Sequence, residues 1–126
     1  MITEDYCSFE LSKLLKEKGF DVPCKYAWHG GIKKPDFHRH SINFNGGNYK
    51  DLRTKWYSAP THQMAMKWLR EVHGLNIFVI QDEENQNCFR AIIQSKLLIN
   101  GRYGLNRETY EEAVDAALKY SLENLI

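Results

Sequence analysis

The C-terminal segment of the chain, from Tyr110 to Leu125, repeats its apolar residues with the period of an α-helix. Thr109 and Glu112 have the spacing of a capping box, in which two side chains satisfy free backbone N–H groups at the start of a helix. The opposite face of the segment is acidic. A helix with one apolar face has to bury that face, so this segment predicts a packed core made with the rest of the chain.

Two further segments have the helical period. Residues 60–74 begin at a proline and end at Gly74, as a helix commonly does. Near the N-terminus, Thr3 is expected to cap a helix that stops at Gly19, where a glycine permits a left-handed turn. The expected apolar stripe of the middle helix consists of Ala65, Trp68, Leu69 and Val72.

The segments between these helices are typical of strands. Residues 24–29 alternate in the manner of a half-buried strand, and residues 76–81 and 88–94 flank a polar run, which predicts a hairpin. Residues 49–57 are expected to supply another strand. Residues 30–48 contain two Gly-Gly pairs, a proline and no sustained period, so we expect a long loop there.

The order of these elements predicts the α+β class, with a small antiparallel sheet and about three helices packed on it. Because the chain has 126 residues, we expect a single α+β domain that covers residues 1–126. One shared core is expected to contain Leu14, Leu69, Val79, Ile92, Val114, Leu118 and Leu122.

The composition, with 43% hydrophobic and 26% charged residues, is that of an ordinary globular protein. No apolar run approaches the roughly 20 residues that span a bilayer, and the N-terminal segment lacks the pattern of a secretory signal. The three cysteines, Cys7, Cys24 and Cys88, are odd in number and widely spaced, which argues against a disulfide framework. We therefore expect a cytoplasmic protein with reduced thiols and no membrane partner.

His62 and His73 fall on one face of the predicted middle helix, which raises the possibility of a reactive pair. The 11 residues that separate them rise roughly 16 Å along the helix axis. Two imidazoles at that distance cannot share a metal ion or exchange a proton directly. We expect both histidines to have structural roles at the ends of the helix.

A second group, formed by Cys24, His29, His38 and His40, combines residue types that bind zinc. Its spacing matches no structural zinc pattern, and an extended segment would point Cys24 and His29 to opposite sides. His38, His40 and Asn43 could suggest an HNH-type nuclease, but the hairpin and helix that hold such a metal site are missing. No metal site and no cofactor are predicted.

Cys24 is the one cysteine with a lysine and a histidine, Lys25 and His29, close in sequence. A nucleophilic thiol needs such a base and an electropositive setting. A structural role for Cys24 is nevertheless favoured, and we predict no catalytic residue.

A basic segment carries the best functional signal. The net charge of +1 hides an uneven distribution, since residues 33–55 hold six bases against two acids. Aromatic residues interleave with these bases, and such a mixture can stack on nucleobases and contact phosphates. Alternatively, the aromatic residues belong to the core and the bases only solvate loops. The candidate binding surface comprises Lys33, Lys34, Phe37, Arg39, His40, Lys50, Arg53 and Lys55.

The segments APTHQMAMKWLREVHGLNIFVI (59–80) and YEEAVDAALKYSLENLI (110–126) resemble a family of small uncharacterised proteins of gut Bacteroidetes and their phages. The opening ITEDYCSFELSKLLKEKGFD (2–21), followed by Cys24, fits the same pattern, whereas residues 30–55 match nothing in it. The resemblance implies a phage or prophage accessory protein. It carries no known activity, so it assigns no functional residue.

Together, these features predict a non-enzymatic protein-binding domain of phage or mobile-element origin, whose partner is an unknown host or phage protein. The alternative is a nucleic-acid-binding module that uses the basic aromatic segment at 25–57. An enzyme ranks third, because no catalytic motif is present.

Overall fold

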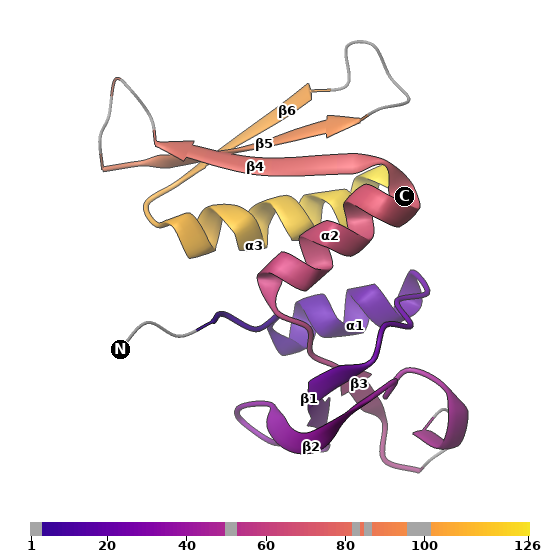
Figure 1. The fold of residues 1–126 in the computed structure, drawn as a ribbon. Coiled ribbons are helices and arrows are strands. Elements are labelled where there is room, and N and C mark those ends of the chain that lie inside the picture. The colour runs from indigo at the N-terminus through magenta and orange to yellow at the C-terminus, as the bar shows by residue number, and fades with distance from the viewer. Residues whose placement is uncertain (1–3, 50–52, 82–83, 85–86, 96–101) are drawn as a thin grey trace. The chain divides into compact units, whose positions relative to one another are not determined.

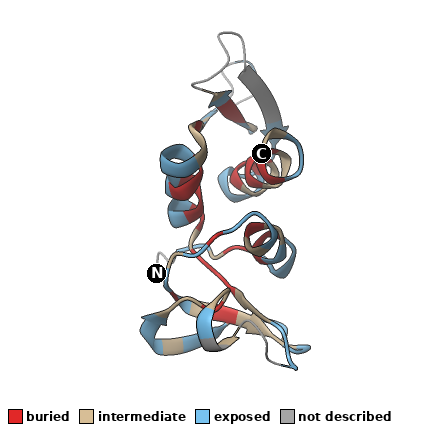
Figure 2. Cartoon of the chain, turned by 90° about the vertical axis from the view of Figure 1, so that its right-hand side faces the viewer, coloured by how far each residue is buried: buried red, intermediate tan, exposed pale blue. Residues whose placement is uncertain are grey.

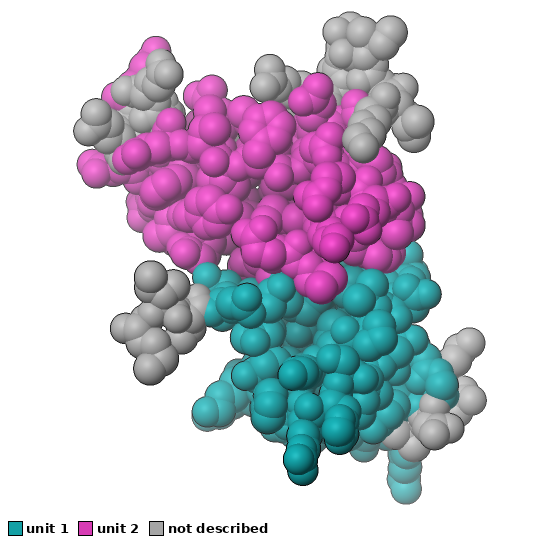
Figure 3. Space-filling view, viewed as in Figure 1, with its two compact units in different colours: residues 1–61 teal, residues 62–126 magenta. Residues whose placement is uncertain are grey.

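The structure is a computed structural model that describes residues 4–49, 53–81, 84, 87–95 and 102–126. The chain divides into two compact units, Met1–Thr61 (unit 1) and His62–Ile126 (unit 2), which Figure 3 colours separately. The described residues form three α-helices and two three-stranded antiparallel sheets, one sheet in each unit. The predicted α+β class is therefore confirmed, with the strands divided between two sheets.

Unit 1 contains one α-helix and one sheet with the strand order β2-β1-β3 (Figure 1). Its elements in chain order are α1 (Phe9–Glu17), β1 (Cys24–His29), β2 (Asp36–Ile42), the 3-10 turn η1 (Gly47–Tyr49) and β3 (Trp56–Ser58). The strand predicted at 24–29 is confirmed as β1. Of the strand expected at 49–57, only the end forms β3, and residues 50–52 lie outside the described part of the chain.

Helix α1 begins later than the sequence predicts. Ser8 is the N-cap, and its hydroxyl accepts a hydrogen bond from the backbone N–H of Leu11 at 3.2 Å. The preceding residues are extended, because Tyr6 forms a bridge with Thr61 and the Cys7 N–H donates to the Pro60 carbonyl at 2.9 Å. A cap at Thr3 is therefore wrong, since these backbone groups pair with a distant segment instead of starting a helix.

The end of α1 follows the prediction. Gly19 has a φ of +91°, a left-handed conformation that glycine adopts without strain. The next residue turns back, and the N–H of Phe20 donates to the Leu15 carbonyl at 2.9 Å. The fully buried apolar side chains of unit 1 include Leu11, Leu15, Phe20, Ala27 and Phe44.

The segment expected to be a long loop, residues 30–48, contains the strand β2. β2 pairs antiparallel with β1, and Phe37 and Asp36 of β2 lie opposite Tyr26 and Ala27 of β1. The loop prediction is wrong here because β2 is solvated on both faces, so its sequence has no apolar alternation. Backbone pairing with β1, which the sequence pattern of β2 does not reveal, makes it a strand.

Unit 2 contains a sheet with the order β4-β5-β6 and two α-helices. Its elements are α2 (His62–His73), β4 (Leu75–Gln81), β5 (Phe89–Ser95), β6 (Arg102–Arg107), α3 (Tyr110–Tyr120) and the π-helical turn η2 (Ser121–Leu125). Both helices lie on the same face of this sheet (Figure 1). The hairpin predicted at 76–94 is confirmed as β4 and β5, whereas β6 is a strand that the sequence did not predict.

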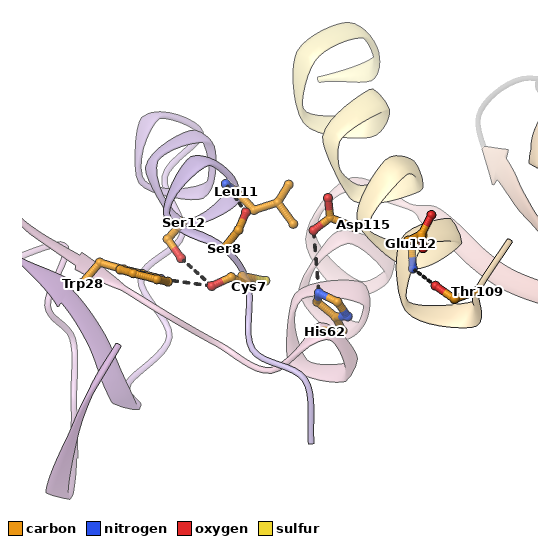
Figure 4. A network of polar contacts seen from close by, with 9 residues as sticks. All are labelled: Cys7, Ser8, Leu11, Ser12, Trp28, His62, Thr109, Glu112 and Asp115. Carbon is orange, nitrogen blue, oxygen red and sulfur yellow. Dashed lines mark hydrogen bonds and ion pairs between the residues drawn. The ribbon is translucent and has the colours of Figure 1, made fainter. Parts of the chain in front are cut away.

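The last helix begins at the cap that the sequence predicts. Thr109 is the N-cap of α3, and its hydroxyl accepts a hydrogen bond from the N–H of Glu112 at 3.1 Å (Figure 4). The buried apolar residues of α3 and η2 are Ala113, Val114, Ala117, Leu118 and Leu122. The helical period read from the sequence therefore identifies the buried face.

Two details of the expected core are wrong. Val72 of α2 is 60% exposed, and Met66 is buried in the stripe together with Ala65, Trp68 and Leu69. Leu14 of unit 1 and Val79 of unit 2 are only half-buried, so neither is among the buried residues of its unit. Figure 2 shows how buried and exposed residues divide around each helix.

Within the described ranges, no helix combines the length and the apolar character that crossing a membrane requires.

Replacing Leu118 with alanine should lower the free energy of unfolding by about 2–5 kcal/mol, because its fully buried side chain would leave a cavity. Val72→Ala is the matched control: its side chain is exposed, and the expected loss is below about 0.5 kcal/mol. Urea titration followed by circular dichroism measures both. A loss below about 0.5 kcal/mol for Leu118→Ala would contradict the described packing of α3.

Candidate binding surface

The register of the unit 1 sheet gathers basic residues that are about 20 positions apart in sequence. β1 is the central strand, and Trp56 of β3 lies opposite His29, the last residue of β1. The turn at 30–35 and the residues just before β3 therefore leave the sheet at the same end. We call this end, with the exposed side chains of Lys33, Lys34, Arg53 and Lys55, the basic end.

The remaining candidates divide into three cases. Arg39 and His40 are exposed on β2, in the part of the strand between Phe37 and Ile42 where its register with β1 shifts. Lys50 lies outside the described residues.

Phe37 is the most exposed large apolar side chain among the described residues, at 63%. Its ring contacts Tyr26 at a centroid distance of 5.4 Å, and Tyr26 contacts Tyr6 at 4.1 Å. Burial and, to a lesser degree, the Tyr26 side chain raise the pKa of the Tyr6 hydroxyl above its usual value. Phe37 therefore ends a row of aromatic rings at the edge strand, since β2 pairs with β1 alone within the described ranges.

Most other aromatic residues of the basic segment pack against one another. Trp56 stacks on His29 at 4.1 Å and on Phe44 at 5.7 Å. Tyr49 and His38 each contact both Phe44 and Trp56. These rings pack against one another within unit 1, and such contacts compete with stacking on nucleobases.

On the other face of the sheet, Phe9 of α1 contacts Trp28 and Tyr57 at 6.0 and 5.3 Å. The indole N–H of Trp28 donates to the Cys7 carbonyl at 3.0 Å, and the Ser12 hydroxyl donates to the same oxygen at 3.4 Å (Figure 4). The position of Trp28 is thus fixed both by the contact of its ring with Phe9 and by the hydrogen bond of its indole N–H.

The histidines of the considered zinc group do not converge on a metal site. His29 pairs through Nε2 with the carboxylate of Asp36 across the β1–β2 hairpin. The buried Nε2 of His38 has no hydrogen-bond partner among the described residues. Within the same residues, no group of three or more His, Cys, Asp or Glu side chains could hold a metal ion.

The two helix histidines have different surroundings. His62, at the start of α2, lies 3.9 Å from the carboxylate of Asp115 in α3 (Figure 4). His73, at the end of α2, meets the ring of Trp68 edge-on at 4.8 Å. The two imidazoles thus have different neighbours at opposite ends of α2, so they do not form the reactive pair that the sequence analysis considered.

Two lysines of α1 were missed by the sequence analysis, although they adjoin the basic end. Lys16 donates from Nζ to the Trp56 carbonyl at 3.0 Å, and its ammonium lies 4.9 Å from the centre of the Tyr57 ring. Its pKa is lowered from the usual value by partial burial and, secondarily, by Lys55. Lys13 lies one turn earlier in the helix. The i, i+3 spacing of these lysines predicts that they share one face of α1, but it does not predict that this face lies beside β3.

Comparison of the chain with protein-family models, with curated proteins and with solved structures finds no match.

Cys24 should react slowly with alkylating reagents. The thiol is 7% exposed and donates to the Val22 carbonyl, and burial raises its pKa to about 12, so it remains protonated at pH 8. We expect iodoacetamide to label it at least about 100-fold more slowly in the native protein than in urea, because only the thiolate reacts. Peptide mapping by mass spectrometry measures the rate, with the partly exposed Cys88 as an internal reference. Equal rates in both states would contradict the described burial.

Proposed function

We propose that this chain is a non-enzymatic protein-binding domain that takes an extended, acidic segment of a partner along the outer edge of β2. The observation that carries this proposal is the exposed Phe37 on an edge strand whose neighbouring turn carries Lys33 and Lys34.

The edge of β2 supports the backbone part of such binding. A strand that pairs on one side only presents alternate N–H and C=O groups along its free side. An extended peptide can pair with these groups and so add a strand to the sheet. Exposed Arg39 also discourages unspecific pairing between edges, because a charged side chain on an edge strand opposes aggregation.

The side chains support selectivity. Phe37 can supply an aromatic anchor, the kind of residue that often dominates the binding energy of an interface. The basic end adds four exposed cations, Lys33, Lys34, Arg53 and Lys55, which favour an acidic partner and speed its association.

A nucleic-acid ligand is the less favoured alternative. The rings that could stack on bases, Trp56, Phe44 and Tyr49 among them, are in contact with one another. The net charge of the chain is only +1, so general attraction to a polyanion is weak.

The resemblance of residues 59–80 and 110–126 supports a phage or mobile-element origin. We propose a cytoplasmic location, where the thiols of Cys7, Cys24 and Cys88 would remain reduced. The partner would then be a host or phage protein of the same compartment.

Selection of random displayed peptides on the purified protein should enrich acidic sequences with alternating apolar residues. Phe37→Ala and the double change Lys33→Glu/Lys34→Glu should each weaken a selected peptide at least about tenfold in fluorescence anisotropy. Phe78→Ala, which removes a partly exposed phenylalanine of β4 in unit 2, is the matched control and should leave affinity unchanged. Peptides that bind equally well to all variants would argue against the β2 edge.

Oligonucleotides provide the opposing measurement. At about 200 mM salt we expect no single- or double-stranded probe to bind more tightly than ~100 μM, the weak end of non-specific affinity. If four bases of this surface contacted a single strand, the log-log dependence of affinity on salt would have a slope near about −2.8. Micromolar binding with that slope, lost in Lys33→Glu/Lys34→Glu, would make nucleic-acid binding the better function.

A further inference from the structure

A pocket of about 330 Å³ lies within unit 1, beside α1 and the start of β3. Its lining residues are Lys13, Lys16, Glu17, Lys55 and Tyr57. The volume is at the lower end of the range of small-molecule sites, about 300–1,000 Å³. The pocket is therefore large enough for a small ligand and too small for a folded partner.

The charge of the lining is unbalanced. Three ammonium groups face one carboxylate, which leaves two positive charges around a small volume. Lys13 and Lys55 form no ion pair with any residue that the structure describes, and neither does Glu17. Like charges gathered in this way repel each other, and an anion between them would relieve the repulsion.

Lys16 is held in position for a ligand. An ammonium group has three N–H donors. One donor of Lys16 bonds to the Trp56 carbonyl, and the ammonium also faces the ring of Tyr57. This arrangement leaves a donor for a ligand and fixes the side chain beforehand, so little further ordering is required on binding.

We propose that this pocket binds a phosphate monoester, with Lys13, Lys16 and Lys55 as its cationic ligands and Tyr57 as an apolar wall. A monoester carries a charge of about −1.5 to −2 at neutral pH, which matches the two excess positive charges of the lining. Lysine binds phosphate as a point charge and needs no bidentate geometry. The ester group would lie against the wall that Tyr57 and the lysine stems provide.

This site does not depend on the β2 edge. Lys55 belongs to both the pocket and the basic end, but Lys13 and Lys16 lie on α1 and Phe37 lies on β2. If the experiment on one site fails, the other proposal is therefore still tested by its own experiment.

The test is a titration of the full ¹⁵N-labelled chain with phenyl phosphate, followed by NMR at constant ionic strength. Saturable shifts should concentrate in α1 and around Tyr57. Lys13→Gln and Lys55→Gln should each weaken binding about threefold to fivefold, and the double variant about tenfold or more. Lys25→Gln is the matched control: this exposed lysine lies at the other end of β1, and affinity should change less than about 1.5-fold. All three substituted positions are exposed, and melting curves verify that each variant folds.

Two further probes identify the source of the ester. O-phosphoserine represents a free metabolite, and a neutral peptide that carries phosphoserine represents a modified protein; binding of either through Lys13 and Lys55 supports the pocket. Three results would overturn it: no saturable binding of phenyl phosphate at about 10 mM, equal weakening by Lys25→Gln, or tighter binding of a single-stranded oligonucleotide that displaces phenyl phosphate.

Discussion

The pairing of β1 on both of its sides is the constraint on which unit 1 depends. Within the described residues it is the one strand of its sheet with two neighbours. β3 has only three residues, and β2 buries little, so neither would be stable without β1. β1 also holds the N-terminal segment, because the indole of Trp28 donates to the Cys7 carbonyl that Ser12 of α1 also uses. One strand thus joins the sheet, the helix and the segment before the helix.

The pairing of β1 also brings basic residues from separate segments close together. Its register brings the turn at 30–35 next to the residues before β3, and α1 adds Lys13 and Lys16 from the side. Solvent weakens the repulsion between the exposed cations but does not remove it. Lys16 is partly withdrawn from solvent, and its pKa is lowered for that reason and by the proximity of Lys55. A cluster of like charges that folding does not neutralise is more useful for binding than for stability.

Unit 2 is stabilised mainly by the burial of apolar side chains between its sheet and its helices. Its sheet has one face covered by α2 and α3, and apolar residues fill the space between them. The His62–Asp115 contact adds a polar link between the two helices. The features on which the proposed binding rests lie in unit 1, whereas the helices of unit 2 have the regular pattern of a packed core.

The sequence by itself determined the elements whose apolar residues face a core with a clear period. α2, α3, β1 and the β4–β5 hairpin lie where the pattern predicted them, and Gly19 ends α1 as expected. The described bases of the candidate surface, Lys33, Lys34, Arg39, Arg53 and Lys55, are all exposed. It failed at the start of α1, where pairing of Tyr6 and Cys7 with residues 60–61 overrides a local capping signal.

Only the tertiary structure decided which residues of the basic segment are available. Trp56 and Phe44 are occupied by mutual stacking, while Phe37 remains exposed, and nothing in their spacing distinguishes them. β2 and the lysine pocket likewise arise from contacts between segments far apart in sequence. The physical reason is that local periodicity reports which side of an element is buried. It does not report which distant backbone or charge will lie beside that element, because long-range pairing sets this.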